Sequence, residues 1–228
     1  MKQEEIITIL DSIYTKVLNG VQTKVEIAGQ RVDSSIEALA TDYLMKDDVE
    51  HAAKKLINNQ IVKCTTSGFI TGLGGIITLP VAIPANVGSV LYVQMRMIAG
   101  LAYMGGYDVR SDQVQTLVYA CLAGISVDQI LKKAGIEAGS KFAKSLVNKI
   151  PGKALKAIND KVGFKLFTKF GEKGVINLGK MIPIVGGIIG GGFDLVETKI
   201  IANRAYRLFI EGDFSATDDE EEIIDVYC

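Results

Sequence analysis

Five polar side chains stand in segments that are otherwise apolar, and they are the residues best suited to chemistry. They are Gln94, Arg96, Asp194, Glu197 and Arg204. Asp194 and Glu197, three positions apart, share one face of a helix. We favour a buried polar network in which Arg96 pairs with one of these two acids, because a buried charge without a partner is strongly destabilising. Two alternatives stay open: a polar lining for a lipid headgroup or an ion, and an acid–base pair with a catalytic duty.

The sequence lacks the usual signatures of catalysis and metal binding. His51 is the only histidine, and its charged neighbours predict an exposed helix surface. One histidine and three dispersed cysteines, Cys64, Cys121 and Cys228, do not make a zinc site. Residues 174–181 approach a phosphate-binding loop, but Met181 replaces the Ser or Thr that would hold magnesium. We therefore predict a protein that is not an enzyme and has no catalytic, metal-binding or cofactor-binding residues.

Lysine dominates the sequence between residues 132 and 180, where twelve lysines meet three acids. Most such runs are the solvated face of amphipathic helices, yet this charge also attracts anionic lipid or an acidic partner. The side chains that we expect to contact an anionic surface are Lys141, Lys144, Lys153, Lys156, Lys165 and Lys169. Few aromatic residues lie between the lysines and no recognition motif is present, so we expect no nucleic acid as a partner.

Two uncharged parts of the sequence are rich in glycine. No charged residue occurs in the 32 positions from Cys64 to Met95, and residues 181–193 are uncharged as well. Glycines four positions apart lie on one helix face and let a second backbone approach closely. Prolines break both parts, so we predict two Gly-rich hairpins, near 68–84 and 183–192, that interlock. The glycines to which we assign this packing role are Gly68, Gly72, Gly186, Gly187, Gly190 and Gly191.

Residues 85–107 have the length of a membrane-spanning helix but carry Arg96 near their middle. A central Arg costs roughly 2.5–3.5 kcal/mol on insertion scales, whereas each Leu or Ile returns about 0.3–0.6 kcal/mol. The segment also contains several small residues, which contribute little. The summed free energy of insertion does not favour an independent membrane span. Close helix packing is the better interpretation of this segment.

The elements that must position all these residues are helices. Apolar residues recur at helical spacing along most of the 228 residues, and there are only four prolines. We expect Asp47 or Asp48 to cap a helix that runs through residue 63. We also expect Ser111 to cap a short helix over 111–124, and Ser126 to cap the helix that follows, to about residue 133. The sequence therefore predicts an all-α protein, a single multi-helix globular bundle in which the two Gly-rich hairpins pack centrally.

Charge and apolar spacing divide the chain into three parts. We predict N-terminal amphipathic helices over residues 1–44, a helical domain over 45–212 and an acidic, flexible tail over 213–228. The tail holds seven of the 26 acids and no base, so the net charge of −1 hides a basic body with 25 bases against 19 acids. The acids near the N-terminus do not fit a signal peptide, and the dispersed cysteines fit a reducing compartment. We expect a cytoplasmic protein that can lie on the inner face of the membrane.

Two stretches resemble the EcsC family of bacterial proteins. In LPVAIPANVGSVLYVQMRMIAGLAYMGGYD (79–108), paired prolines precede an apolar helix that holds Gln-x-Arg. In IPIVGGIIGGGFDLVETKIIANRAYRLF (182–209), Ile-Pro-x-Val-Gly leads into a last helix, although Phe193-Asp194 replaces the small polar residue that the family favours there. The resemblance covers about residues 45–212. The family is named after a protein encoded beside the components of an ABC transporter, so the resemblance implies a fold more than a reaction.

These features together predict a non-catalytic helical protein that associates with membranes peripherally or conditionally. We expect a scaffold or regulatory role towards a membrane system, with anionic membrane lipid or a membrane protein as the partner. Two alternatives remain: a membrane-inserting, pore-type module that uses the Gly-rich hairpins, and a soluble module for protein–protein interaction. The sequence does not specify an oligomeric state.

Overall fold

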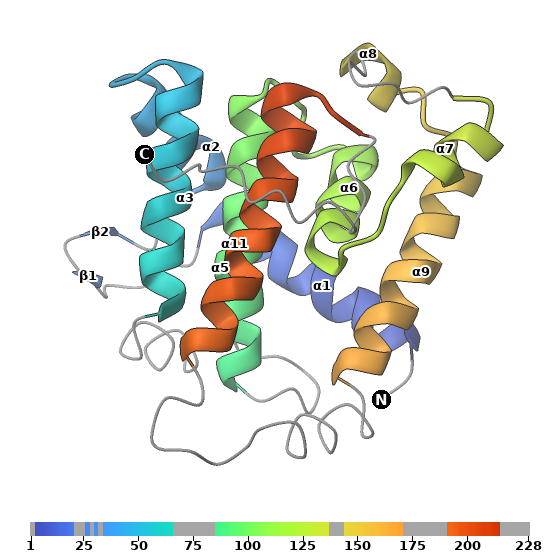
Figure 1. Ribbon diagram of the computed structural model, residues 1–228, viewed down its shortest axis with the longest axis horizontal. Coiled ribbons are helices and arrows are strands. Elements are labelled where there is room, and N and C mark those ends of the chain that lie inside the picture. Colours follow the sequence, from blue (N-terminus) through green and yellow to red (C-terminus); the bar gives the residue numbers. More distant parts are fainter. Residues whose placement is uncertain are drawn as a thin grey trace.

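The computed structural model describes residues 3–20, 26–27, 30–31, 34–65, 85–136, 144–170 and 191–214 (Figure 1). Helices dominate these ranges and surround one core, so the predicted all-α class and single bundle are confirmed. The helices are α1 (Gln3–Asn19), α2 (Ile36–Leu44), α3 (Val49–Thr65), α5 (Ala85–Met104), α6 (Asp112–Ala123), α7 (Asp128–Lys133), α8 (Lys144–Val147), α9 (Gly152–Phe170), α11 (Gly191–Tyr206) and the π-helix η1 (Arg207–Glu211). The predicted Gly-rich hairpins lie outside the described residues, except for the first residues of α11.

A short β ladder separates α1 from α2. Strands β1 (Glu26–Ile27) and β2 (Gln30–Arg31) are antiparallel, with Glu26 opposite Arg31. Helix α1 ends where Gly20 takes a φ of 78°, a left-handed conformation that glycine adopts readily. The ladder is a departure from the helices that we expected throughout residues 1–44.

Two of the three helix starts follow the capping residues that the sequence predicted. The Ser111 hydroxyl accepts a hydrogen bond from the Val114 N–H at 3.3 Å at the start of α6. Asp48 accepts one from the His51 N–H at 3.0 Å at the start of α3. The prediction for Ser126 is wrong, because Val127 occupies the N-cap position of α7 and the Ser126 hydroxyl donates to a carboxylate instead.

Helix α5 forms the centre of the bundle and packs against α1, α2, α3, α6 and α11. Every residue from Leu91 to Ala102 is buried. Among the described residues, α5 is the one helix long and apolar enough to cross a membrane, over Val87–Met104. However, 83% of that stretch is buried inside the fold, so the helix serves here as the core of a bundle.

Two glycines allow neighbouring elements to approach α5 closely. A Cβ on Gly100 would lie 2.6 Å from Leu56 Cδ2 of α3. A Cβ on Gly105, directly after α5, would overlap the backbone carbonyl oxygen of Phe209 in η1. The absence of a side chain at these two positions is therefore what permits the contacts of α5 with α3 and η1.

Helix α3 runs in the opposite direction to α5 and α11, and the ends of these helices define an upper and a lower end of the bundle (Figure 1). At the upper end, where α3 begins and η1 ends, Tyr206 lies within electrostatic range of Glu50. The opposite, lower end is formed by the last residues of α3 and α9 and the first residues of α5 and α11, namely Thr65, Phe170, Ala85 and Gly191. The two uncharged, Gly-rich parts of the sequence therefore attach to the fold at the same end.

Candidate functional site

Gln94 connects α5 with α11, the two helices that carry the family-like stretches. Its Nε2 donates a hydrogen bond of 3.0 Å to the Thr198 hydroxyl, and both side chains are buried. A buried polar group without a partner typically destabilises a fold by about 1–3 kcal/mol, so this pair stabilises the contact. Thr198 was not among the residues that we singled out from the sequence, since a threonine in a helix carries no charge to attract attention.

Arg96 makes its hydrogen bonds at the start of α2. The guanidinium donates to the Ser34 carbonyl oxygen at 2.8 Å, to the Ser34 hydroxyl at 3.1 Å and to the Tyr92 hydroxyl at 3.2 Å. The side chain is only 4% exposed, so neutral oxygens hold a buried cation. Within the described part of the chain, Glu197 is not among its partners, and the side chain of Asp194 lies outside that part.

A second cation, Lys63 of α3, lies close to Arg96. Burial and, as the smaller cause, the charge of Arg96 lower the pKa of Lys63 to about 8. A like charge therefore lies close to Arg96, where we had predicted a carboxylate.

Arg204 and Lys165 bind the carbonyl groups at the C-terminal end of α6. Arg204 Nη1 donates to the Cys121 carbonyl at 2.9 Å, and Lys165 Nζ donates to the Gly124 carbonyl at 2.6 Å. The last carbonyls of a helix carry partial negative charge, so cations stabilise this position. Gly124 has a φ of 65°, and a Cβ on it would lie 3.1 Å from nitrogens of both cations.

Three of the five predicted polar residues therefore make contacts with three different elements of the described structure. Gln94 bonds to α11, Arg96 bonds to the residue before Ser35, the N-cap of α2, and Arg204 bonds to α6. Glu197 is half-buried in α11. The part of the prediction that concerns Asp194 lies outside the described side chains.

The glycines predicted to pack helices together lie mostly outside the described residues. These are Gly68, Gly72, Gly186, Gly187 and Gly190, whereas Gly191 opens α11. The close contacts that the structure does describe involve Gly100 and Gly105. A spacing of four positions does not identify this pair, because the two glycines are five positions apart.

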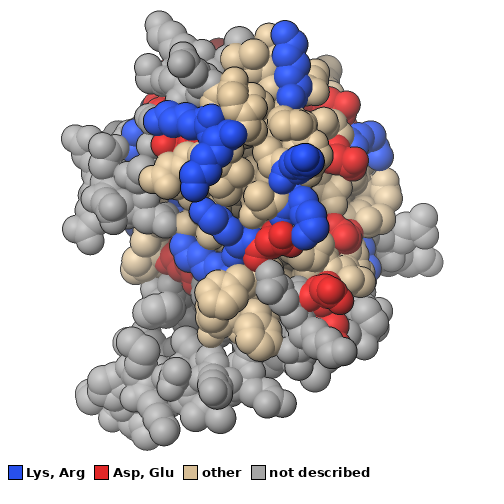
Figure 2. Space-filling model, turned by 90° about the vertical axis from the view of Figure 1, so that its right-hand side faces the viewer, with Lys and Arg blue, Asp and Glu red and all other residues tan. Residues whose placement is uncertain are grey.

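The lysines form an exposed basic surface over α7, α8 and α9, at the right of Figure 1 and facing the viewer in Figure 2. Four of the predicted contact residues are on it: Lys144, Lys153, Lys156 and Lys165. Lys141 and the side chain of Lys169 lie outside the described residues. The basic surface also includes four lysines that we had not named, Lys132, Lys133, Lys149 and Lys161.

Half of this basic surface is already engaged with neighbouring groups. Lys132 and Lys156 pair with acids one turn away, Lys165 binds α6, and Lys144 lies 5.9 Å from the ring centre of Tyr107. No ion pair within the described ranges involves the other four lysines, which are Lys133, Lys149, Lys153 and Lys161. These four side chains are the ones available to an anionic partner.

Phe164 stands out on the solvent side of α9. Its side chain is 62% exposed and lies between the exposed Lys161 and Lys165 in the sequence. The buried stripe of α9 runs through Ile158 and Val162 on another face. Phe164 falls outside that stripe already in the sequence, which is the signal that would have identified it.

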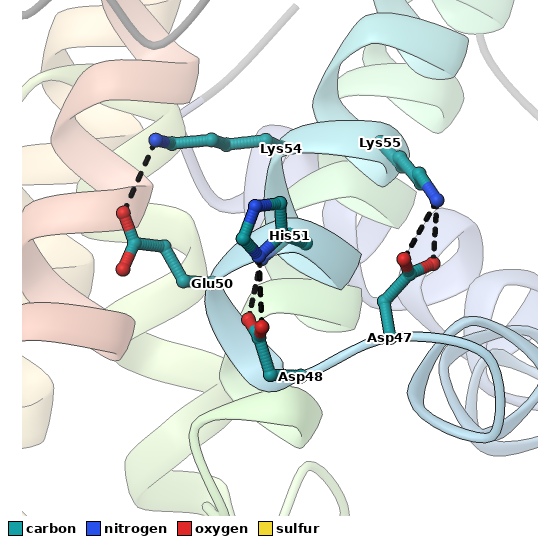
Figure 3. A network of polar contacts seen from close by, with 6 residues as sticks. All are labelled: Asp47, Asp48, Glu50, His51, Lys54 and Lys55. Carbon is teal, nitrogen blue, oxygen red and sulfur yellow. Dashed lines mark hydrogen bonds and ion pairs between the residues drawn. The ribbon is translucent and has the colours of Figure 1, made fainter.

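His51 lies on the exposed start of α3, as the sequence predicted. Its Nδ1 is 2.8 Å from a carboxylate oxygen of Asp48, and both side chains are mostly exposed. Figure 3 shows this contact together with two neighbouring ion pairs, Lys54–Glu50 and Lys55–Asp47. An arrangement so open to water is typical of a helix N-terminus stabilised by local charges.

An open groove of about 470 Å³ lies beside this network, between α2 and α3. Its charged walls include Lys46, Asp42, Lys55 and Asp47. These side chains pair with one another, at 2.8 Å for Lys46–Asp42 and 2.7 Å for Lys55–Asp47. The groove therefore presents mutually neutralised charges to a ligand.

The thiols of Cys64 and Cys121 are buried and neither is in a disulfide bond. Burial raises the pKa of Cys121 to about 12, so this thiol is protonated at neutral pH and is a poor nucleophile. In the ranges that the structure describes, no group of three or more His, Cys, Asp or Glu side chains could hold a metal ion.

Comparisons with known proteins give the chain a family. The sequence profile of the EcsC protein family matches residues 3–210, and so includes the N-terminal helices that we had placed outside the resemblance. The uncharacterized protein YdbA of Bacillus subtilis (strain 168) is 23% identical over 167 residues, which are 70% of this chain and 58% of that protein. This chain thus spans rather more than half the length of that relative. No solved structure matches the chain. Because the profile match takes in nearly all of the sequence, this chain belongs to the EcsC protein family.

Proposed function

We propose that this chain is a non-catalytic helical protein that associates peripherally with anionic membranes and has a scaffold or regulatory role towards a membrane system. The observation that carries the proposal is the basic surface, where four lysines have no ion pair among the described residues and where Phe164, three positions after Lys161, is exposed. A Lys or Arg near an anionic membrane surface contributes about 1 kcal/mol of binding free energy. A few lysines and one aromatic side chain supply a reversible interaction of moderate strength.

Peripheral contact is favoured over insertion of α5. The helix is the core of the bundle, and it holds Gln94 and Arg96, whose hydrogen bonds reach α11 and the start of α2. To place α5 in hydrocarbon, the protein would have to break these bonds and expose the partners of α5. A surface contact through α9 requires no such rearrangement.

We expect the fourfold variant Lys133→Gln, Lys149→Gln, Lys153→Gln, Lys161→Gln to bind anionic vesicles at least about tenfold more weakly than the wild type. The reason is the loss of four charges, each contributing up to about 1 kcal/mol and partly screened by salt. Flotation with vesicles of phosphatidylglycerol and phosphatidylcholine measures the bound fraction.

The matched control is the threefold variant Lys46→Gln, Lys54→Gln, Lys55→Gln. Lys54 and Lys55 lie on α3 and Lys46 lies two residues after α2, at the upper end, and each is in an ion pair. This control should bind vesicles like the wild type. Equal losses in both variants, or no loss in the fourfold variant, would contradict the proposal that the basic surface carries the interaction.

A further inference from the structure

The described structure ends at Phe214, beside one of the helices that carry the basic surface. Phe214 is only 2% exposed and lines a small pocket together with Ile125, Ser126 and Val127. Val127 is the N-cap of α7, and α7 packs against α9. The chain therefore leaves the described fold next to the loop that leads into the basic surface.

The sequence that follows Phe214 is strongly acidic. Residues 215–228 contain six acids and no base, and five of the acids are consecutive, at positions 218–222. We call these five residues the acidic run. An extended chain spans at most about 3.3–3.6 Å per residue, so Asp218 can lie up to about 14 Å from Phe214, and Glu222 up to about 28 Å.

The lysines that have no ion pair among the described residues lie within this range. Lys133 is six residues after Val127, which corresponds to about 9 Å along α7. Lys149 and Lys153 flank the first residue of α9, and Figure 1 shows α7 above the start of this helix. Lys161 lies about 12 Å further along α9 than Lys153. Three of the four lysines are therefore near the place where the chain leaves the described fold.

Charge favours the basic surface over the other group of lysines at the upper end. The described residues 126–136 and 144–168, which form the basic surface (Figure 2), hold eight lysines and two acids, a net charge of +6. Residues 36–55, in α2 and the first half of α3, hold three lysines and five acids, a net charge of −2. An acidic segment is therefore attracted to the first region and repelled by the second.

We propose that the acidic run binds the basic surface of its own chain and competes there with anionic lipid. The competition rests on the proposed membrane association and adds its regulation. A tethered segment meets its site at an effective concentration on the order of millimolar. A membrane presents many more anionic groups than the acidic run, so the run weakens membrane binding without abolishing it. It thereby raises the content of anionic lipid that the protein needs for binding.

Zero-length cross-linking tests the contact itself in the absence of lipid. A carbodiimide joins a carboxylate to an amine where the two are in contact, and mass spectrometry of the wild-type chain identifies the joined residues. We expect the acidic run to be joined mainly to Lys133, Lys149 and Lys153, at a yield that does not depend on protein concentration and falls at about 500 mM salt. Cross-links mainly to the lysines of residues 36–55, or none to the basic surface, would overturn the inference.

Vesicle binding tests the competition. The full-length variant that removes the charges of the acidic run is Asp218→Asn, Asp219→Asn, Glu220→Gln, Glu221→Gln, Glu222→Gln. At about 100 mM salt it should bind vesicles of phosphatidylglycerol and phosphatidylcholine at least about fivefold more tightly than the wild type, because the lysines no longer have an internal partner. A lipid titration measures the two affinities. An unchanged affinity would overturn the inference and leave the proposed function standing, provided that the wild type floats.

The fourfold lysine variant described above separates competition from a general effect of net charge. In that variant the lysines that the acidic run covers are absent, so neutralising the run should tighten binding by less than about twofold. The same gain in both backgrounds would show that the run acts through net charge alone, which overturns the inference. If neither the wild type nor any variant floats, the proposed function is wrong, and the cross-links decide by themselves whether the acidic run lies on the basic surface.

Discussion

Gly105→Ala is expected to prevent folding or to lower the free energy of unfolding by more than about 3 kcal/mol. A Cβ at this position would overlap the carbonyl oxygen of Phe209 and lie 3.0 Å from its carbonyl carbon. These are backbone atoms of η1, so no rotation of a side chain can relieve the overlap. The methyl group can be accommodated only if η1 moves away from α5, which opens the core at the upper end.

Two other glycines provide a graded control for this prediction. A Cβ on Gly100 would meet the flexible end of Leu56, so Gly100→Ala should destabilise by about 1–2 kcal/mol. At Gly152, the start of α9, no atom lies within 4 Å of the place that a Cβ would take, so Gly152→Ala should be neutral or slightly stabilising. Urea denaturation of the three variants measures their free energies of unfolding and so gives the order of their stabilities. A Gly105→Ala protein as stable as Gly152→Ala would show that η1 does not pack against α5 as described.

Arg96→Ala is expected to lower the free energy of unfolding by about 2–4 kcal/mol, which corresponds to roughly 5–15 °C in Tm for a chain of this size. The substitution removes three hydrogen bonds and leaves the Ser34 carbonyl and the Tyr92 hydroxyl without that partner. It also removes a long, buried side chain from the contact between α5 and the start of α2, and thereby leaves a cavity.

Arg110→Ala is the matched control for the loss of an arginine. Arg110 pairs with Glu37 at 2.7 Å, but its side chain is 54% exposed, so its removal should change the stability by less than about 1 kcal/mol. Differential scanning calorimetry of both variants makes the comparison. If Arg96→Ala melts within about 2 °C of the wild type, well below the shift expected for a buried group, the guanidinium is not held in the position described here.

Helices and their starts could be predicted from the sequence because the signals are local. Apolar spacing and the capping residues Asp48 and Ser111 act over three or four positions, and the structure has helices starting at both places. The failure at Ser126 shows the limit of such signals. A serine can cap a helix or bond to a nearby acid, and the chain conformation around Val127 decides between them.

The partners of the buried polar residues could not be predicted, because they depend on which helices become neighbours. Gln94 and Arg96 are two positions apart, so their side chains point in nearly opposite directions, about 160° apart around α5. Gln94 therefore meets α11, and Arg96 reaches Ser34 before α2. This difference in direction follows from helix geometry alone, and it argues against one network that contains both residues. The partners of each residue still depend on which helices become its neighbours.

The candidate surface was predicted in part. Lysines at Lys144, Lys153, Lys156 and Lys165 are exposed or partly so, as expected from a solvated helix face. Their engagement with other groups could not be predicted from the sequence, because Lys165 binds Gly124, which is 41 positions away. The exposure of Phe164 could have been predicted from the sequence, because this residue falls outside the buried stripe of α9.

Flotation of the unmodified protein tests the central proposal, membrane association through a basic surface, most directly. The bound fraction is measured with vesicles of phosphatidylcholine alone and with vesicles that also contain phosphatidylglycerol, at low salt of about 50 mM and high salt of about 500 mM. We predict binding only to the anionic vesicles at low salt, with most of it lost at high salt, because screening weakens the attraction of the lysines. Equal binding to both kinds of vesicle, or no binding to either at low salt, would contradict the proposal.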